Sequence, residues 1–375
     1  MAVVTSTPRT VPDRIEKRIT RLESLLDLPP RGGASALQVG IEARQALLAA
    51  RTSDDALREI RLRTKFLAKP SEVAGPTRIQ HVSTSKGAAL KVLLLALFEL
   101  QARSPRPSGA SLIPRTQLAL ERETPDAGMP SGERPSWINL AALPTADATR
   151  RSTHASSRRR NRLRQLHSAL ERLDQLGRIE LKKAPGEHHR YEAFWVLDEG
   201  RANDSSLGLT RYTVPEFGRG RERREITTIP LEFFLHGWID ALNDNEIITY
   251  LILRLMAQAH PRVHATSGVF LTSGFRLSMF NLDRGFEAHR MLARYGLITT
   301  RPDPRRSARG TIHQQRTDGK GNLHQFQLND AALSQDAPAR VITCLQRYAD
   351  HLTLNESRQR DRDEAEQNPP LPDTH

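Results

Sequence analysis

A run of arginines at the start of one amphipathic segment is the strongest chemical signal in the sequence. Residues 156–162 read Ser-Ser-Arg-Arg-Arg-Asn-Arg, and leucines follow at helical spacing. These leucines are Leu163, Leu166, Leu170, Leu173 and Leu176. Their spacing of three and four residues predicts a helix with one buried face. The opposite face carries Asn161, Arg164, Gln165, Ser168 and Arg172.

This polar face has the chemistry that double-stranded DNA requires. A helix fits the major groove with its N-terminal residues near the base edges, where Arg pairs with guanine and Asn or Gln pairs with adenine. We expect base contacts from Asn161, Arg164, Gln165 and Ser168. We expect phosphate contacts, which set the register, from Arg158, Arg159, Arg160 and Arg162. The alternative is a solvated arginine-rich face without a ligand.

The distribution of charge supports a polyanionic partner. The 375 residues carry 56 Lys and Arg against 43 Asp and Glu, a formal net charge of +13. Between Arg150 and Arg190 stand twelve Lys or Arg and four Asp or Glu, so this short segment alone has a net charge of +8. A basic excess of this size indicates nucleic acid or an anionic membrane surface as the partner.

An internal repeat organises the elements around this segment. Residues 169–179 and 288–298 share Ala, Leu, Gly and Ile at a constant offset of 119 residues. In each copy a helix runs into a Gly suited to a left-handed C-cap, and a β-branched residue then starts a strand. Hairpins are expected next, between 179–183 and 190–197 in the first copy and between 311–316 and 322–328 in the second.

Two further helices are predicted upstream of each repeated helix. In the first copy they span residues 88–101 and 137–143. In the second they span 246–258, with Asn243 as N-cap and Glu246 in a capping box, and 275–280, before the repeated helix at 283–295. Three helices followed by a hairpin, twice over, predict tandem winged helix-turn-helix domains. The fold class is mainly α with small β-hairpins (α+β).

The remaining sequence completes a domain layout. We expect disorder at 1–12, a helical N-terminal region at 13–81, a first winged-helix domain at 82–198 with a loop insert at about 104–135, a linker at 199–224, a second winged-helix domain at 225–330, a C-terminal helix at 331–353 and a disordered tail at 354–375. Within the N-terminal region, Leu57, Ile60 and Leu67 predict a third helix after those at Ile15–Leu26 and Leu37–Leu48.

Further DNA contacts are expected outside the arginine-rich helix. At the tip of the first wing they are Lys182, Lys183 and Arg190. In the second copy they are Arg284, Arg290 and Arg294 on the third helix, and Arg305, Arg306 and Arg309 beside the wing. The second copy is less basic, so dimerisation is the alternative role for it.

Tandem winged-helix domains joined by a linker resemble the replication initiators of bacterial plasmids and integrative elements. Residues 229–238, running into 242–247, look similar to the entry of such a domain. The resemblance implies binding of repeated origin sequences, recruitment of host replication proteins, no catalysis by this chain, and a cytoplasmic location on nucleoid or plasmid. The main alternative is a dimeric winged-helix transcriptional regulator.

Other function classes lack their motifs. The single cysteine, Cys344, excludes a disulfide framework and a multi-Cys zinc site, and no apolar run approaches the length of a membrane span. No phosphate-binding Gly-x-x-x-x-Gly-Lys-Ser/Thr motif is present. His313 and Arg316 followed by Tyr348 match the order of tyrosine recombinases, which leaves a strand transferase as a remote alternative. We expect no cofactor and no metal.

Overall fold

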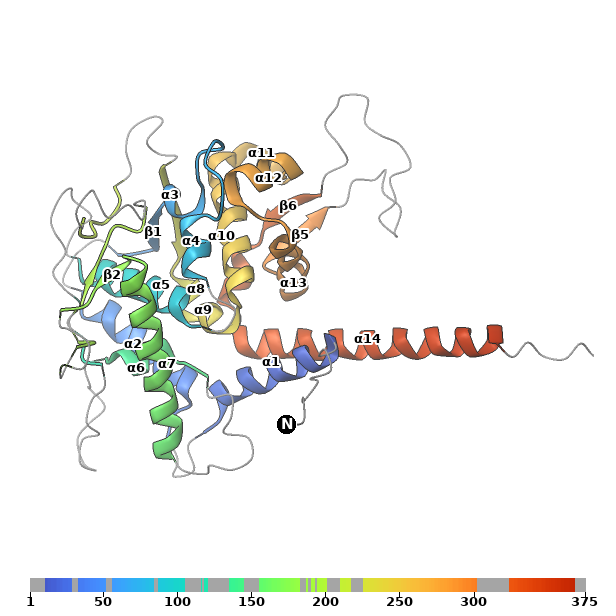
Figure 1. The fold of residues 1–375 in the computed structure, drawn as a ribbon, viewed down its shortest axis with the longest axis horizontal. Helices are drawn as coiled ribbons and strands as arrows, with labels where there is room; N and C mark the ends of the chain where they lie inside the picture. Colours follow the sequence, from blue (N-terminus) through green and yellow to red (C-terminus); the bar gives the residue numbers. More distant parts are fainter. Residues whose placement is uncertain are drawn as a thin grey trace, which may run out of the picture.

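The computed structural model describes residues 11–28, 33–51, 56–83, 87–104, 116, 118–120, 135–144, 155–182, 187, 190–192, 194–200, 210–216, 225–301 and 324–367. These residues form a mainly helical α+β protein with three small antiparallel sheets of two strands each (Figure 1). None of the helices in these ranges combines the length and apolar character needed to cross a membrane.

The N-terminal region contains α1 (Val11–Leu26), α2 (Ala36–Ala49), β1 (Glu59–Arg63), α3 (Thr64–Leu67) and α4 (Arg78–Val82). The Ser35 hydroxyl caps α2 by accepting a hydrogen bond from the Gln38 backbone N–H at 3.2 Å. The predicted third helix is wrong at Ile60, because Ile60 and Leu62 alternate with half-buried residues and pair in a strand. A period of two suits a strand with one buried face.

The first unit consists of α5 (Ala89–Arg103), α6 (Trp137–Ala141), α7 (Ala155–Gln175), β2 (Ile179–Glu180) and β3 (Trp195–Val196). Strands β2 and β3 pair antiparallel, as expected. The predicted linker at 199–224 is partly structured, since Arg211 forms a β-bridge with Leu197 and Tyr212 is buried. The tip of the predicted hairpin, residues 183–186, lies outside the described residues.

The second unit follows β4 (Ile226–Pro230), α8 (Glu232–Leu235) and α9 (Trp238–Ala241). It consists of α10 (Asp244–Ala259), α11 (Pro261–Thr266), α12 (Ser273–Phe280), α13 (Ala288–Tyr295), β5 (Ile298–Arg301) and β6 (Gln325–Leu328). The predicted capping box is confirmed, because Asn243 accepts from the Glu246 N–H and Glu246 accepts from the Asn243 N–H, both at 3.0 Å. The predicted partner of β6 is wrong, because β6 pairs with β5 and its Phe326 also bridges Val269; the predicted strand at 311–316 lies outside the described residues.

Both units end their last helix in the same way. Gly177 after α7 and Gly296 after α13 have φ angles of 60° and 84°, a region that favours glycine. The next N–H in each case bonds back into the helix, Arg178 to the Leu173 carbonyl and Leu297 to the Leu292 carbonyl. The predicted repeat of left-handed C-caps at an offset of 119 residues is therefore confirmed.

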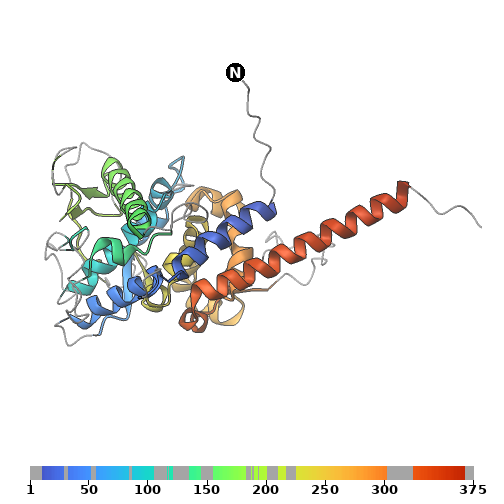
Figure 2. The ribbon, with the colours of Figure 1, turned by 90° about the horizontal axis from the view of Figure 1, so that it is seen from below.

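The C-terminal helix α14 (Ala337–Gln367) extends away from the body, and α1 packs along its first part (Figures 1 and 2). The predicted end at residue 353 is too early, since the helix continues through 354–367. The only apolar residues in the sequence of that stretch are Leu354, which is exposed, and Ala365, but opposite charges stand four residues apart, a spacing that supports an exposed helix. Helix α1 begins at Val11, inside the predicted disordered segment 1–12.

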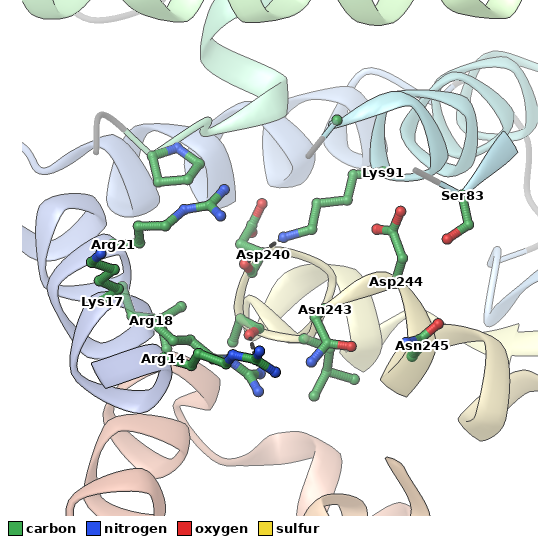
Figure 3. Close-up of a pocket in the computed structure, with 15 residues that line it drawn as sticks. Arg14, Lys17, Arg18, Arg21, Ser83, Lys91, Asp240, Asn243, Asp244 and Asn245 are labelled. Atoms are coloured by element: carbon green, nitrogen blue, oxygen red, sulfur yellow. Dashed lines mark hydrogen bonds between the residues drawn. The ribbon is translucent and has the colours of Figure 1, made fainter. Parts of the chain in front are cut away.

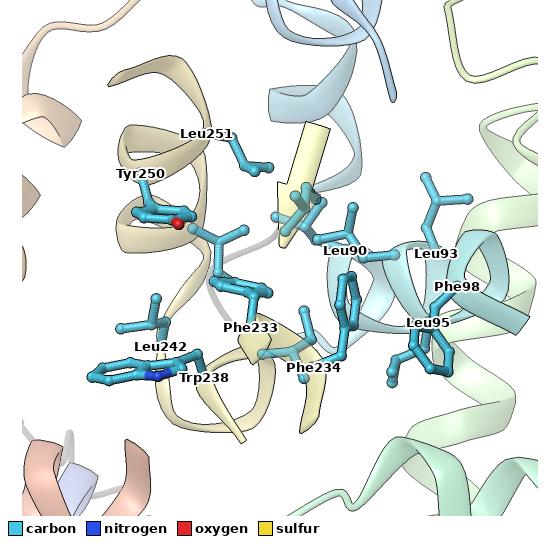
Figure 4. Packing of buried hydrophobic residues seen from close by; sticks show 14 of the residues in the cluster. Leu90, Leu93, Leu95, Phe98, Phe233, Phe234, Trp238, Leu242, Tyr250 and Leu251 are labelled. Carbon is cyan, nitrogen blue, oxygen red and sulfur yellow. The ribbon is translucent and has the colours of Figure 1, made fainter. Parts of the chain in front are cut away.

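One continuous core joins the two units (Figure 4). The ring of Phe98 on α5 lies 5.1 Å from that of Phe234 on α8, and Phe233 stacks on Tyr250 of α10 at 5.4 Å. Trp137 and Trp238 are fully buried. Strand β1 also pairs with β4 across the molecule, from Glu59 opposite Pro230 to Arg63 opposite Ile226. The N-terminal region thus belongs to the same body as both units.

Candidate nucleic-acid interface

Helix α7 has the amphipathic division that its sequence predicts. Leu166, Leu170 and Leu173 are completely buried against the first unit, while Arg164 and Ser168 are exposed. Helix α7 packs on α5 and α6. This helix of 21 residues thus packs with its leucine face on α5 and α6 and presents its polar face away from the core.

The exposed face is a regular row of side chains. Arg160, Arg164, Ser168 and Arg172 are exposed and recur every four residues. A step of four residues rotates a helix by about 40°, so the four side chains form a slowly turning stripe about 18 Å long. Asn161 is half-buried beside it. The sequence-based selection of site residues omitted Arg172, although its place on the polar face followed from the same spacing.

Two predicted DNA contacts instead hold α7 to the segment before it. The Gln165 amide donates to the Pro144 carbonyl at 2.8 Å, and the Arg162 guanidinium donates to the Leu143 carbonyl at 3.0 Å. Burial and the neighbouring Arg158 lower the pKa of Arg162. Leu143 and Pro144 follow α6, so these bonds fix the angle between α6 and α7.

Two further basic residues of the first unit also have intramolecular partners. Arg158 lies 3.8 Å from Asp27, at the end of α1. Arg190 lies 3.5 Å from Asp174 of α7 with its side chain only 11% exposed. The neighbouring Tyr191 stacks on His167 of α7 at 4.2 Å. The segment that leads into β3 is therefore bonded to α7.

The remaining predicted contacts of this unit are Arg159, which is half-buried, and Lys182, which is exposed. Lys183 lies outside the described residues.

Burial lowers the pKa of His167, although the nearby Glu171 opposes the shift. The Tyr191 hydroxyl donates a hydrogen bond to that same Glu171. Tyr191 is thus held against α7 by this bond and by its stacking on His167.

The two predicted contacts of the second unit whose side chains are described, Arg290 and Arg294, are exposed but have intramolecular partners. Arg290 is exposed, but its guanidinium forms an ion pair with Glu287 at 2.9 Å. Arg294 covers the ring of Tyr348 on α14, 4.0 Å from the ring centre. Arg305, Arg306 and Arg309, and the side chain of Arg284, lie outside the part that the structure describes.

The candidate catalytic and metal groups show no assembled centre in the described ranges. Within those ranges no group of three or more His, Cys, Asp or Glu residues could hold a metal ion. His264 accepts a hydrogen bond from the Leu328 backbone N–H through Nε2 at 2.8 Å, which ties α11 to β6. Tyr348 lies beneath Arg294, whereas His313 and Arg316 fall among residues 302–323, outside those ranges.

Sequence reasoning missed a second basic surface. Arg14, Lys17 and Arg21 are exposed on one face of α1, to one side of the buried Ile15 and Leu22. The signal was present, because basic residues spaced three and four apart mark one face of a helix.

Comparison with protein-family models, curated proteins and solved structures returned no match.

Proposed function

We propose that this protein binds specific sequences of double-stranded DNA through helix α7, and that its two units are winged helix-turn-helix domains. The exposed row on α7 carries the proposal: three arginines and a serine along a rigid helix, backed by fully buried leucines. Arg164 and Ser168 contact base edges, and Arg160 and Arg172 bind phosphates. Gln165 and Arg162 act indirectly, by holding α7 at its angle to α6.

The order of elements supports the winged-helix assignment. In the second unit, Val269 bridges Phe326 of β6, so a short extended segment after α10 and the short α11, and before α12, joins the hairpin. In the first unit the Thr116 N–H bonds to the Phe194 carbonyl in the corresponding place. A helix, an extended segment, two helices and a hairpin is the order of a winged helix, in which the last helix enters the major groove.

The joining of both units in one chain favours a replication initiator of a plasmid or mobile element. Strands β1 and β4 and the shared core hold the units together, so a single chain carries two related domains. Such a chain suits direct or asymmetric repeats, whereas a dimeric regulator derives palindromic sites from the two-fold symmetry of two chains.

Selection of bound sequences from a random duplex pool tests this proposal. We expect enrichment of one motif, present as direct repeats. Palindromic enrichment would favour the dimeric regulator, and absence of any enriched motif would contradict sequence-specific binding.

The salt dependence of binding tests which residues contact phosphates. Each phosphate contact contributes about 0.9 to the slope of log affinity against log salt. The double variant R160A/R172A should therefore lower the slope by nearly two units. The matched control is R262A, which removes an exposed arginine of α11. Equal slopes for R160A/R172A and R262A would place the phosphate contacts elsewhere.

Base contacts are tested by specificity instead of salt dependence. Ser168→Ala should weaken binding to the selected motif by about 0.5–1.5 kcal/mol and leave binding to random duplex unchanged. Equal losses on both duplexes would contradict a base contact at Ser168.

A further inference from the structure

A basic pocket lies between α1 and the start of α10 (Figure 3). Its volume is about 500 Å³, within the range of small-molecule sites. One wall is α1, and the opposite wall is the turn from Asp240 to Asn245 that joins α9 to α10. The rest of the lining comes from Ser83, Gly87, Lys91 in the first turn of α5, and Pro144. The pocket therefore lies where the N-terminal helix, the first unit and the second unit meet.

The lining carries a net positive charge. Its cationic residues are Arg14, Lys17, Arg18, Arg21 and Lys91, and its carboxylates are Asp240 and Asp244. Five cations against two carboxylates give a net charge of +3. Arg14, Lys17, Arg18 and Arg21 come from successive turns of one face of α1, the wall that lies across from the start of α10 (Figure 3).

Two of these charges are already neutralised within the protein. Arg18 binds both oxygens of the buried Glu246 at 2.6 and 2.7 Å. Both oxygens of Asp240 accept from the fully buried Arg44, at 2.7 and 2.9 Å. Those pairs leave Arg14, Lys17, Arg21 and Lys91 facing the single carboxylate of Asp244.

Lys91 lies among charged groups of both signs. Its ammonium group donates to the Asp240 backbone carbonyl at 2.8 Å, and that acceptor carries no full charge. Burial lowers the pKa of Lys91; Asp240 and Asp244 oppose the shift, and Arg21 and Arg18 add to it. The ammonium thus has two guanidinium groups as well as two carboxylates near it. An anion in the pocket would counter the repulsion among the cations, and helix α10 begins there, with the positive end of its dipole toward the space.

We propose that this pocket binds a small phosphorylated molecule, whose phosphate groups contact Arg14, Lys17, Arg21 and Lys91. Guanidinium and ammonium groups converging on one space are the donors that bind phosphate oxygens most strongly. The volume exceeds what a single phosphate group fills, so the ligand carries several phosphates or a phosphate with an organic part.

Such a ligand would act on the DNA-binding helix through Pro144. Pro144 lines the pocket, and its carbonyl accepts the Gln165 amide of α7. A bound molecule therefore contacts the segment that sets the angle of α7, as well as elements of both units. This consequence rests on the proposed DNA-binding function, whereas the binding site itself does not.

Isothermal titration calorimetry of the full chain with inorganic tripolyphosphate, ATP and a short duplex tests the proposal. We expect binding of tripolyphosphate or ATP that the triple variant R14Q/K17Q/R21Q weakens by at least a hundredfold, since each lost charged contact weakens binding about tenfold or more. All three residues are exposed, so the variant should keep the wild-type circular dichroism and melting temperature. R262Q, which also removes an exposed charge but on α11, should bind as the wild type does.

The outcomes separate the pocket from the DNA interface. R160A/R172A should bind tripolyphosphate or ATP normally, so a failure of DNA binding leaves the pocket proposal intact. If neither compound binds the wild type, or if R14Q/K17Q/R21Q and R262Q bind equally, the proposal is wrong. If the triple variant weakens only duplex binding, the basic face of α1 contacts DNA and the small-molecule assignment is overturned.

Discussion

The buried ion pair between Arg44 and Asp240 should be among the most sensitive points of the fold. Arg44 lies on α2 with no exposed side-chain surface, and its partner Asp240 lies on α9 with 1% exposed. Besides both carboxylate oxygens, Arg44 donates to the carbonyls of Phe234 and Leu140, at 2.8 and 2.9 Å. One guanidinium therefore satisfies acceptors on α9, α6 and α8.

Replacing either member should destabilise the protein by different amounts. Asp240→Asn removes the countercharge of a buried guanidinium, which costs about 3–5 kcal/mol, while the bonds to the two carbonyls remain. Arg44→Met leaves a buried carboxylate unpaired and also deprives two carbonyls of their donor, each at about 1–3 kcal/mol. Arg44→Met should therefore lower the free energy of unfolding by about 2–6 kcal/mol more than Asp240→Asn.

Urea denaturation followed by tryptophan fluorescence measures both effects, because Trp137 lies on α6 and Trp238 on α9. The exposed Arg262→Gln serves as the control and should change the midpoint little. A loss below about 1 kcal/mol for either buried variant would refute the reasoning. So would a greater loss for Asp240→Asn than for Arg44→Met, because the carbonyl bonds would then contribute nothing.

Three further perturbations have definite expected results. Gly268→Ala should lower the melting temperature, because the added Cβ would lie 2.9 Å from the Phe326 carbonyl oxygen and the backbone has a φ of +88°; the cost is about 1–3 kcal/mol. Gly274→Ala should raise the melting temperature, because its Cβ would enter open space on α12. Gln165→Ala should cost about 0.5–1.5 kcal/mol in the free energy of unfolding through the lost bond to Pro144, and the exposed Arg164→Ala should cost almost nothing; equal losses would contradict a bracing role. Burial lowers the pKa of His289, so the unfolded chain binds a proton at this residue more readily than the folded protein does. Acidification below about pH 6.5 should therefore destabilise the wild type. His289→Leu should show a smaller change in melting temperature than the wild type between about pH 7.5 and 5.5.

The elements that the sequence predicts well are those specified by neighbouring residues. Helix α7 follows from its leucine spacing, the start of α10 from Asn243 and Glu246, and the two C-caps from Gly177 and Gly296. Each signal lies within about one or two turns of the residue that it positions. Local hydrogen bonds and burial of one face then determine the structure without help from distant parts of the chain.

Strand β1 depends instead on a distant partner, and so do the hydrogen bonds that Arg162 and Gln165 of α7 make to the segment after α6. The segment from Glu59 to Arg63 is too short for a periodic pattern to distinguish strand from helix, and its partner β4 is far along the chain. In the same way, the sequence marks Gln165 and Arg162 as polar residues of α7. Only the position of the Leu143 and Pro144 carbonyls shows that they are committed to internal bonds.

The basic face of α1 illustrates a different limit. Its charges are visible in the sequence, but basic residues on a helix are most often merely solvated. What distinguishes Arg14 and Arg21 is that the turn before α10 and the ammonium of Lys91 lie across from them. That arrangement arises from tertiary packing, so no local pattern could have indicated it.

The pairing of β1 with β4 has a consequence for biosynthesis. Arg61 stands opposite Thr228, 167 positions later in the chain. At roughly 5–20 residues per second, the ribosome reaches that partner some 8–33 s after it has made β1. During this interval β1 lacks its partner strand, and Ile60 and Leu62, which are buried in the folded protein, lack part of their surroundings. Strand β1 therefore cannot pair until β4 has been synthesised, and until then its exposed edge must be tolerated or covered by a chaperone.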